Sequence, residues 1–188
     1  MKGPAPIVLV LTLIAALVAG ASMRGDSGLV TVYTQSASSG EWRLDMVPAD
    51  RVVAIVLDQE GLDRLLRERI QLRPALAGVD VDFETHVLLV AYLGAMPTGG
   101  YSIAVTRVQT YAAGQNQPGN LAVKLAVASP DPGSVVTQAF TYPADAVPIR
   151  RDAWPAGVLE ALARGELPVE VTDQDERDWG PALVYSGG

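Results

Sequence analysis

The chain has 188 residues with no cysteine, one histidine and a formal net charge of −7. Without cysteine it can form no disulfide, thiolate metal site, cysteine nucleophile or lipid-modified cysteine. An acidic surface as a whole does not attract nucleic-acid phosphates or anionic lipid heads. The length is sufficient for one domain with its own core.

The N-terminus has the layout of an exported protein. Lys2 precedes a short apolar run over 7–18, and Ala19-Gly20-Ala21 supplies the small residues of a cleavage site. The run is shorter than the roughly 20 residues of a spanning helix. We therefore predict that residues 1–21 are a signal peptide, with an uncleaved N-terminal anchor as the alternative, and that 22–28 form a linker. In both cases the remainder is extracytoplasmic: secreted, periplasmic or membrane-anchored facing outward.

The rest of the chain is dominated by strand patterns. Residues 87–93 form a continuous apolar run, which suits a central strand buried on both faces. The other patterns are shorter, alternate or are β-branched, and recur at hairpin spacing, which favours antiparallel pairing. The expected strands are 29–34, 42–47, 52–57, 87–93, 101–106, 121–127, 135–142 and 167–171.

Two helices are expected among these strands. Asp58 offers an N-cap for a main helix over 58–70, whose apolar residues recur at helical spacing. Those residues are Leu62, Leu65, Leu66 and Ile70, and the opposite face offers the pairs Glu60–Arg64 and Asp63–Arg67. A shorter helix lies between Pro155 and Gly165.

These elements predict an α+β, β-rich fold: an antiparallel sheet or sandwich with one main helix and a short C-terminal helix. Residues 29–172 are expected to form a single domain. Residues 173–188 begin with four carboxylates and are expected to be a mobile acidic tail.

A search for catalytic and metal-binding patterns finds little. The lone His86 cannot supply a zinc site, and no nucleophile elbow accompanies it. Asp80, Asp82 and Glu84 alternate and would share one face of a strand, where they could hold Ca²⁺ or act as acid and base, although a solvated edge is the simpler interpretation. No nucleotide-binding glycine motif is present. We therefore expect a protein that is not an enzyme, with no catalytic residues, metal or cofactor.

The turn over 94–101 is the most distinctive feature of the sequence. Pro97 presets a turn, two glycines allow positive φ, and Tyr101 starts the next strand. A hairpin that needs glycine sterically is one interpretation, and a loop that offers backbone and an aromatic ring to a partner is the other. The candidate binding residues are Met96, Pro97, Thr98, Gly99, Gly100 and Tyr101.

The same residues resemble a known family. Val81-Asp82-Phe83, the apolar strand, Gly94 and Pro97-Thr98-Gly99-Gly100-Tyr101 are similar to the C-terminal domain of PrcB, a subunit of a secreted bacterial protease complex. Val136-Thr137-Gln138 and Thr141-Tyr142-Pro143 continue the pattern, so that the resemblance covers 58–150. It implies an extracytoplasmic, non-catalytic domain that associates with or stabilises a secreted or envelope protease. Relatives are often lipoproteins, whereas this chain lacks the cysteine.

Two alternatives remain open. Thr98-Gly99-Gly100-Tyr101 also resembles the loop of chagasin-type cysteine protease inhibitors, with Met96 where an asparagine is expected. This resemblance implies a protease inhibitor acting through 96–101. The other alternative is an envelope structural or ligand-binding domain without a protease partner. None of the three involves nucleic acid, and membrane contact is expected only through an uncleaved N-terminal segment.

Overall fold

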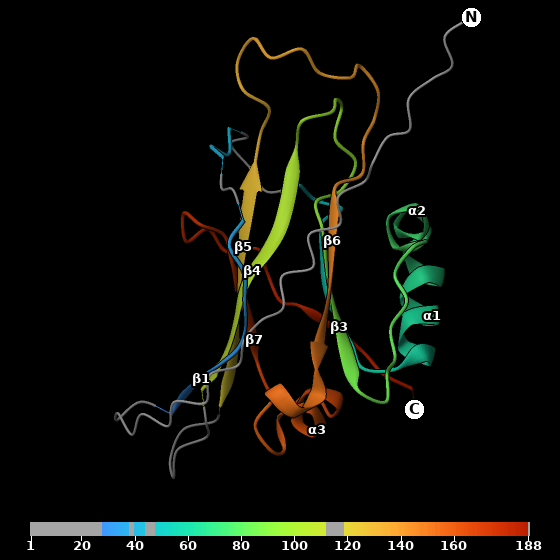
Figure 1. Cartoon of the computed structure of the whole chain (residues 1–188), viewed down its shortest axis with the longest axis vertical. Coiled ribbons are helices and arrows are strands. Elements are labelled where there is room, and N and C mark those ends of the chain that lie inside the picture. Colours follow the sequence, from blue (N-terminus) through green and yellow to red (C-terminus); the bar gives the residue numbers. More distant parts are fainter. Residues whose placement is uncertain (1–27, 38–39, 44–47, 112–118, 188) are drawn as a thin grey trace, which may run out of the picture.

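The computed structural model describes residues 28–37, 40–43, 48–111 and 119–187. These form two four-stranded sheets packed face to face, with a helical layer outside one of them (Figure 1). The predicted β-rich sandwich is thereby confirmed. The predicted signal peptide or anchor, most of the linker and residues 44–47 lie outside the described residues.

Sheet A has the order β1-β4-β5-β7. Its strands are β1 (Leu29–Thr34), β4 (Ser102–Tyr111), β5 (Asn120–Ala128) and β7 (Val169–Thr172). Each of the first three pairs antiparallel with its neighbour, but β7 runs parallel to β5. The expected strands at 29–34, 101–106, 121–127 and 167–171 all belong to this sheet.

Sheet B has the order β6-β3-β2-β8. Its strands are β6 (Ala144–Arg150), β3 (His86–Tyr92), β2 (Val52–Val56) and β8 (Leu183–Tyr185). The outer strand β8 runs parallel to β2, while the other pairs are antiparallel. Both sheets are therefore mixed, because their last strands arrive through crossovers that hairpin spacing does not reveal.

The strands β2 and β3 are buried on both faces, as expected for 87–93. Val53, Ile55 and Leu89 point into the core between the sheets. Val56, Leu88 and the other alternate residues point outward, into a second apolar layer beneath the helices. Alternation sends successive side chains to opposite faces, so each face of sheet B needs its own cover.

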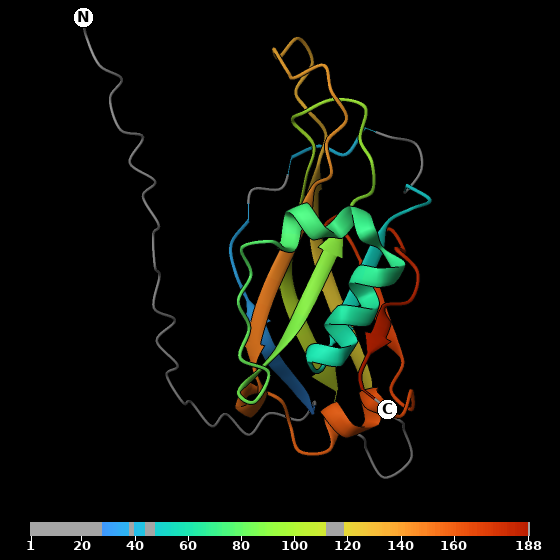
Figure 2. The same ribbon diagram turned by 90° about the vertical axis from the view of Figure 1, so that its right-hand side faces the viewer.

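The outer face of sheet B is covered by α1 (Gln59–Glu68), the 3-10 helix Ile70–Leu72 and α2 (Arg73–Leu76) (Figure 2). Asp58 caps α1 by accepting a hydrogen bond from the Gly61 amide at 2.8 Å. The short helix α3 (Val158–Ala163) and the 3-10 helix Arg151–Ala153 lie at one end of the sandwich. No helix among the described residues is long and apolar enough to cross a membrane.

The main helix differs from prediction in two ways. Leu65 is fully buried, and Leu62 and Leu66 are partly buried, but Ile70 is 65% exposed because α1 ends at Glu68. Neither expected ion pair forms: no carboxylate lies within salt-bridge distance of Arg64 or Arg67 among the described residues.

Two expected strands are absent from the described residues. Glu41, Trp42 and Arg43 have no strand conformation. The stretch 135–142 is a loop with a single bridge, Met96 to Thr141, and β6 begins only at Ala144. Residues 135–142 therefore share one bridge with the facing loop and have no continuous partner strand.

The predicted acidic tail from 173 is wrong, because this segment is part of the sandwich. Asp173 is fully buried and Trp179 lies in the core between the sheets. The Asp173 carboxylate accepts hydrogen bonds from the amides of Asp175 (2.8 Å) and Arg177 (3.0 Å), the Trp179 indole (3.2 Å) and the Arg177 guanidinium (3.1 Å). These bonds direct the chain into β8.

The end of the segment is held as well. We call residues 173–187 the C-terminal strap. The Gly187 amide donates to the Asp58 carboxylate at 2.7 Å, so that one acid both caps α1 and holds the end of the strap. Arg64 donates to the Ser186 carbonyl and lies over the Tyr185 ring. Hydrogen bonds with the side chains of Asp173, Asp58 and Arg64 therefore order the strap together with its buried apolar residues.

The first prediction concerns the helical layer. We expect Leu65→Ala to lower the free energy of unfolding by about 2–5 kcal/mol, because it leaves a cavity between α1 and sheet B. Ile70→Ala, at an exposed position of the same layer, should change it by less than about 0.5 kcal/mol. Urea unfolding measures both, and similar losses for the two variants would contradict the assigned packing.

The second prediction concerns Asp173. Burial alone raises the pKa of this carboxyl, but the hydrogen bonds from Arg177, Trp179 and Asp175 outweigh it and hold the pKa below its ordinary value. The stabilisation is therefore present above the unfolded pKa of about 4 and is lost as the pH falls towards the folded pKa. We expect Asp173→Asn to cost about 2 kcal/mol at pH 7 and to show a weaker loss of stability on acidification.

Urea unfolding at neutral and acidic pH measures both effects. The control is Asp175→Asn, because Asp175 is half-exposed and forms a surface pair with Arg177 at 2.9 Å. Its removal should cost less than about 1 kcal/mol. If the two substitutions cost the same, Asp173 does not organise the strap.

Candidate functional site

Two loops, 94–101 and 129–142, project from the same end of the sandwich and lie against each other (Figure 2). We call them the loop pair. The first connects β3 to β4 and the second connects β5 to β6, so each loop joins one sheet to the other. Loops positioned by a rigid scaffold are where binding residues concentrate.

Hydrogen bonds hold the two loops together. Met96 and Thr141 exchange backbone hydrogen bonds of 2.8 and 2.9 Å, and the Gly99 amide donates to the Thr137 carbonyl at 2.9 Å. The Thr141 hydroxyl donates to the Thr98 carbonyl at 2.7 Å. The loop pair is therefore a preorganised unit, which reduces the conformational entropy lost on binding.

Two glycines permit this arrangement. Gly94 has φ 99°, and a Cβ there would lie 2.3 Å from Oδ1 of Asp50. The other oxygen of that carboxylate, Oδ2, accepts a hydrogen bond from the Ala95 amide at 3.1 Å. Gly100 has φ 85°, and a Cβ there would lie 2.7 Å from the Cβ of Pro130 in the facing loop. The steric interpretation of the glycine turn thus explains these two positions.

The six predicted binding residues are not equally accessible. Met96 is only 3% exposed and belongs to the core, so its prediction as a binding residue is wrong: its side chain anchors the turn. Tyr101 is half-buried, with its ring edge-on to Trp42 at 6.1 Å between centroids. Thr98 and Gly99 are half-buried, and Pro97 and Gly100 are exposed.

The outermost apolar surface comes from the other loop. Val135, Phe140 and Tyr142 are 103%, 68% and 48% exposed. No charged residue occurs in 133–143 or in 94–106. Exposed aromatic side chains in an uncharged surrounding are typical of the core of protein interfaces.

Sequence reasoning missed these three residues because their stretch was assigned to a strand. One signal was available in the sequence. Gly133 and Pro143 are turn residues at the two ends of this short segment, which indicates a loop, so the large apolar residues between them could be exposed.

Charged residues lie at the base of the loop pair. Arg43 donates to the Pro130 carbonyl at 2.7 Å and contacts the carboxylates of Glu41 at 3.0 Å and Asp131 at 3.8 Å. The Ser129 hydroxyl accepts a hydrogen bond from the Arg43 amide at 3.0 Å. The site thus has an apolar tip and a polar rim.

His86 lies elsewhere, at the start of β3. The Thr85 hydroxyl stands between the Asp82 carboxylate, at 2.7 Å, and the His86 Nδ1, at 2.8 Å. A nucleophilic triad places histidine between the acid and the hydroxyl, which is a different order. The hydrogen bond from Thr85 and that from the Glu84 amide lower the pKa of Asp82.

The acidic stretch 80–84 is coil followed by a turn, and not the strand face that was considered. Asp82 accepts the Glu84 amide at 3.0 Å and so closes this turn. Among the residues that the structure describes, no group of three or more acidic or histidine side chains is placed to hold a metal ion.

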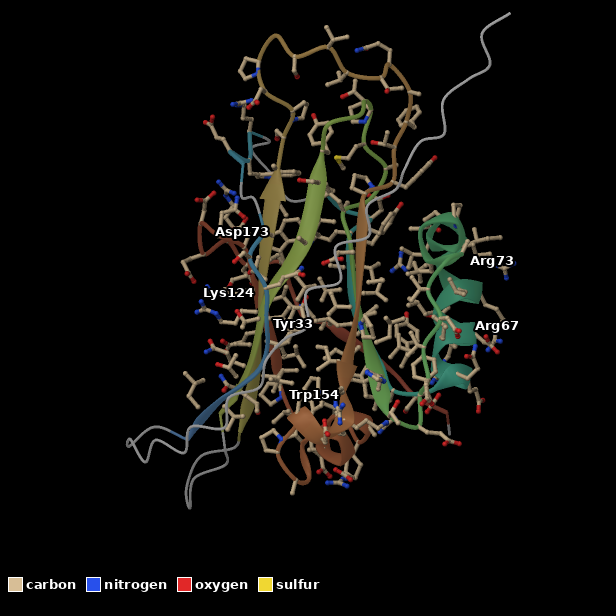
Figure 3. All side chains as sticks on the ribbon, in the orientation of Figure 1. Tyr33, Arg67, Arg73, Lys124, Trp154 and Asp173 are labelled. Carbon is tan, nitrogen blue, oxygen red and sulfur yellow. The ribbon has the colours of Figure 1, made fainter. Side chains whose placement is uncertain are left out.

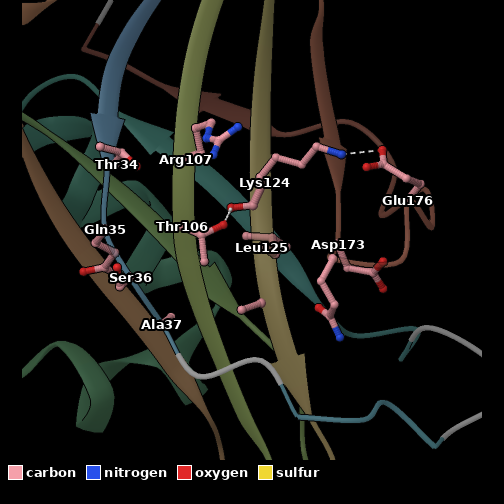
Figure 4. A pocket seen from close by; sticks show the side chains of 12 residues that line it. Thr34, Gln35, Ser36, Ala37, Thr106, Arg107, Lys124, Leu125, Asp173 and Glu176 are labelled. Carbon is pink, nitrogen blue, oxygen red and sulfur yellow. Dashed lines mark hydrogen bonds and ion pairs between the residues drawn. The ribbon is translucent and has the colours of Figure 1, made fainter.

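An open groove of about 460 Å³ lies along sheet A (Figure 4). Several of its polar side chains already have partners within the chain. Lys124 pairs with Glu176, and the Gln174 amide bonds to both backbone groups of Val127 at 2.9 Å. Arg107 is the only lining cation without a carboxylate in salt-bridge range among the described residues. The loop pair is therefore the stronger candidate.

A prediction for the loop pair follows from Gly100. We expect Gly100→Ala to lower the free energy of unfolding by about 2–4 kcal/mol, because it combines left-handed strain with a clash against Pro130. Gly133→Ala provides the control: it has φ 80° but open space around the new Cβ, so only the strain of about 1–2 kcal/mol applies. Equal losses in thermal or urea unfolding would show that the two loops do not approach each other this closely.

Comparison with known proteins bears on this end of the molecule. No curated protein and no solved structure matches the chain. Residues 87–150 match the model of the PrcB C-terminal family. This segment spans β3, both loops, β4, β5 and β6. It leaves α1 and the C-terminal strap outside, although the resemblance in the sequence covers 58–150.

Proposed function

We propose that this protein is a non-catalytic, extracytoplasmic binding domain that associates with or stabilises a secreted or envelope protease complex through its loop pair. The observation that carries the proposal is the uncharged tip formed by Val135, Phe140 and Tyr142. A partner that covers these large apolar side chains removes them from water, and this burial stabilises the complex.

The partner class is suggested by the family match. The matched residues include both loops, so the similarity to the PrcB C-terminal domain covers the proposed docking site itself. PrcB is a subunit of a protease complex, and the N-terminal sequence pattern suggests the same extracytoplasmic compartment. The docking surface, the family and the export pattern therefore support a single function.

A protease inhibitor acting through 96–101 is less well supported. Such an inhibitor needs this turn to lead into a cleft, but Met96 is buried and Thr98, Gly99 and Tyr101 are half-buried. The 94–101 loop thus supports the 129–142 loop, and the latter carries the most exposed side chains. The greater exposure of the 129–142 loop favours docking through Val135, Phe140 and Tyr142.

The proposal is tested by affinity capture from the native host. The full chain is compared with a Val135→Ser, Phe140→Ser variant, and captured proteins are identified by mass spectrometry. We expect a protease that binds the wild-type chain to bind the variant at least about 30-fold more weakly, because hot-spot residues contribute about 2 kcal/mol or more.

A variant with Leu29→Ser and Val30→Ser is the matched control, because these two residues are 37% and 38% exposed on β1, far along the sandwich from the tip. It should capture the same protease as wild type. Retention by the tip variant, or capture of no protease by any chain, would refute the proposal. The activity of the captured protease then separates an assembly partner, which leaves it unchanged or raises it, from an inhibitor.

A further inference from the structure

A short segment, residues 40–43, lies between the C-terminal strap and the loop pair. We call this segment the brace. It reaches the end of sheet A from which the loops project, where the Glu41 carbonyl accepts a hydrogen bond from the Ser129 amide at 3.0 Å. The brace and the strap both lie outside residues 87–150, the part of the chain that matches the family model. The family match therefore does not describe their contacts with the loops.

On one side the brace holds both loops. The Arg43 guanidinium donates to the Pro130 carbonyl at 2.7 Å, and the Arg43 amide donates to the Ser129 hydroxyl at 3.0 Å, so that the base of the second loop is held twice. The Trp42 ring lies edge-on to Tyr101, at the end of the first loop. Because one short segment contacts both loops, its position determines how they stand relative to each other.

On its other side the brace contacts the strap. The rings of Trp42 and Trp179 lie against each other, with 6.3 Å between their centroids. The Asp173 carboxylate holds Trp179 in turn by accepting its indole N–H at 3.2 Å, and Asp173 lies beside sheet A towards the loop end of the sandwich (Figure 3). The Gln174 side chain also donates to the Gly40 carbonyl at 3.4 Å. The strap is thus joined to the brace at two places.

Trp42 connects the two sides of the brace. Its side chain is 4% exposed and belongs to the core between the sheets. Its indole N–H has no hydrogen-bond partner among the described residues, so the ring acts through packing. Protein interiors are close-packed, and a buried ring that is displaced therefore displaces its neighbours. A shift of Trp179 is expected to move Trp42 and, through it, Tyr101.

We propose that the brace couples the order of the C-terminal strap to the geometry of the loop pair. The two states that it links are the loop pair with its cross-loop hydrogen bonds formed and with them broken. Trp42 and Arg43 are positioning residues, which hold the loops in the arrangement that presents the tip. The consequence for docking rests on the proposed function, whereas the coupling itself is a property of the chain alone.

Hydrogen exchange of single amides in the full chain measures this coupling without a partner. The Gly99 amide donates to the Thr137 carbonyl, so its exchange reports the opening of the loop pair. The Val90 amide, buried in the centre of β3, reports global unfolding. The ratio of the two exchange rates therefore separates local opening from loss of the whole fold.

Asp173→Asn tests the strap side. Asparagine has one acceptor oxygen in place of two, so it cannot keep the bonds to both the turn amides and the Trp179 indole. We expect exchange at Gly99 to become about tenfold faster or more relative to Val90. Asp175→Asn removes the same charge from a half-exposed surface pair with Arg177 and should change the ratio by less than about twofold.

Arg43→Ala tests the loop side and should also speed exchange at Gly99 by about tenfold or more. Arg43→Lys keeps a donor for the Pro130 carbonyl and should stay within about threefold of wild type. Arg150→Ala removes an exposed arginine at the far end of β6 and should have less than about a twofold effect. If strap and loops are coupled, Asp173→Asn with Arg43→Ala accelerates exchange by less than the product of the single effects.

Two results would overturn the coupling. One is equal acceleration at Gly99 and Val90, which would show that the variants weaken the whole fold. The other is an unchanged rate at Gly99, or single effects that multiply in the double variant. Capture from the host then tests docking: Arg43→Ala should bind the protease about tenfold more weakly than Arg150→Ala does, and equal binding would exclude the brace from docking. If wild type captures no protease, the proposed function fails and the exchange rates still decide the coupling.

Discussion

The apolar character of β2 and β3 on both faces is the constraint on which the rest of the structure depends. Leu89 and Ile55 require a cover on one side of sheet B, and Leu88 and Val56 require one on the other. Sheet A supplies the first and the α1–α2 layer supplies the second. A helix that covers a sheet with one face must leave its opposite face in water, and here that face is mixed, with Asp63 and Arg67 both exposed.

The same constraint explains which parts of the fold could be predicted from sequence. The continuous run before Tyr92 indicates a strand buried twice, and the spacing from Asp58 to Leu66 indicates an amphipathic helix, because burial itself imposes these patterns. The parallel partners β7 and β8 leave no such mark. Their pairing depends on crossovers that bring residues distant in sequence together, and no local periodicity encodes these.

The C-terminal strap shows why counting charges can mislead. Four carboxylates within 173–178 suggest a solvated segment, but Asp173 is an acceptor for local donors and is buried with Trp179. The relevant signal is an acid followed, two to six residues later, by groups that can donate to it. Such a pattern is short and common, so only the packing of Trp179 between the sheets distinguishes it from an ordinary surface turn.

For the candidate site, the sequence singled out the 94–101 loop, whereas the most exposed apolar side chains at the same end of the molecule belong to the other loop. The glycines of the 94–101 loop drew attention to it. The structure explains Gly94 by the close approach of Asp50 and Gly100 by the close approach of Pro130. The most exposed side chains belong to 129–142, of which 135–142 was predicted to be a strand. A run rich in β-branched and aromatic residues favours strand conformation, but it does not state that a neighbouring strand exists to pair with it.

The loop pair lies beyond the end of the sheets (Figures 1 and 2). Contact through Phe140 and Val135 would remove apolar area from water, so binding there should be little affected by salt. Because hydrogen bonds hold the two loops together before a partner arrives, little conformational entropy is lost when the tip is covered.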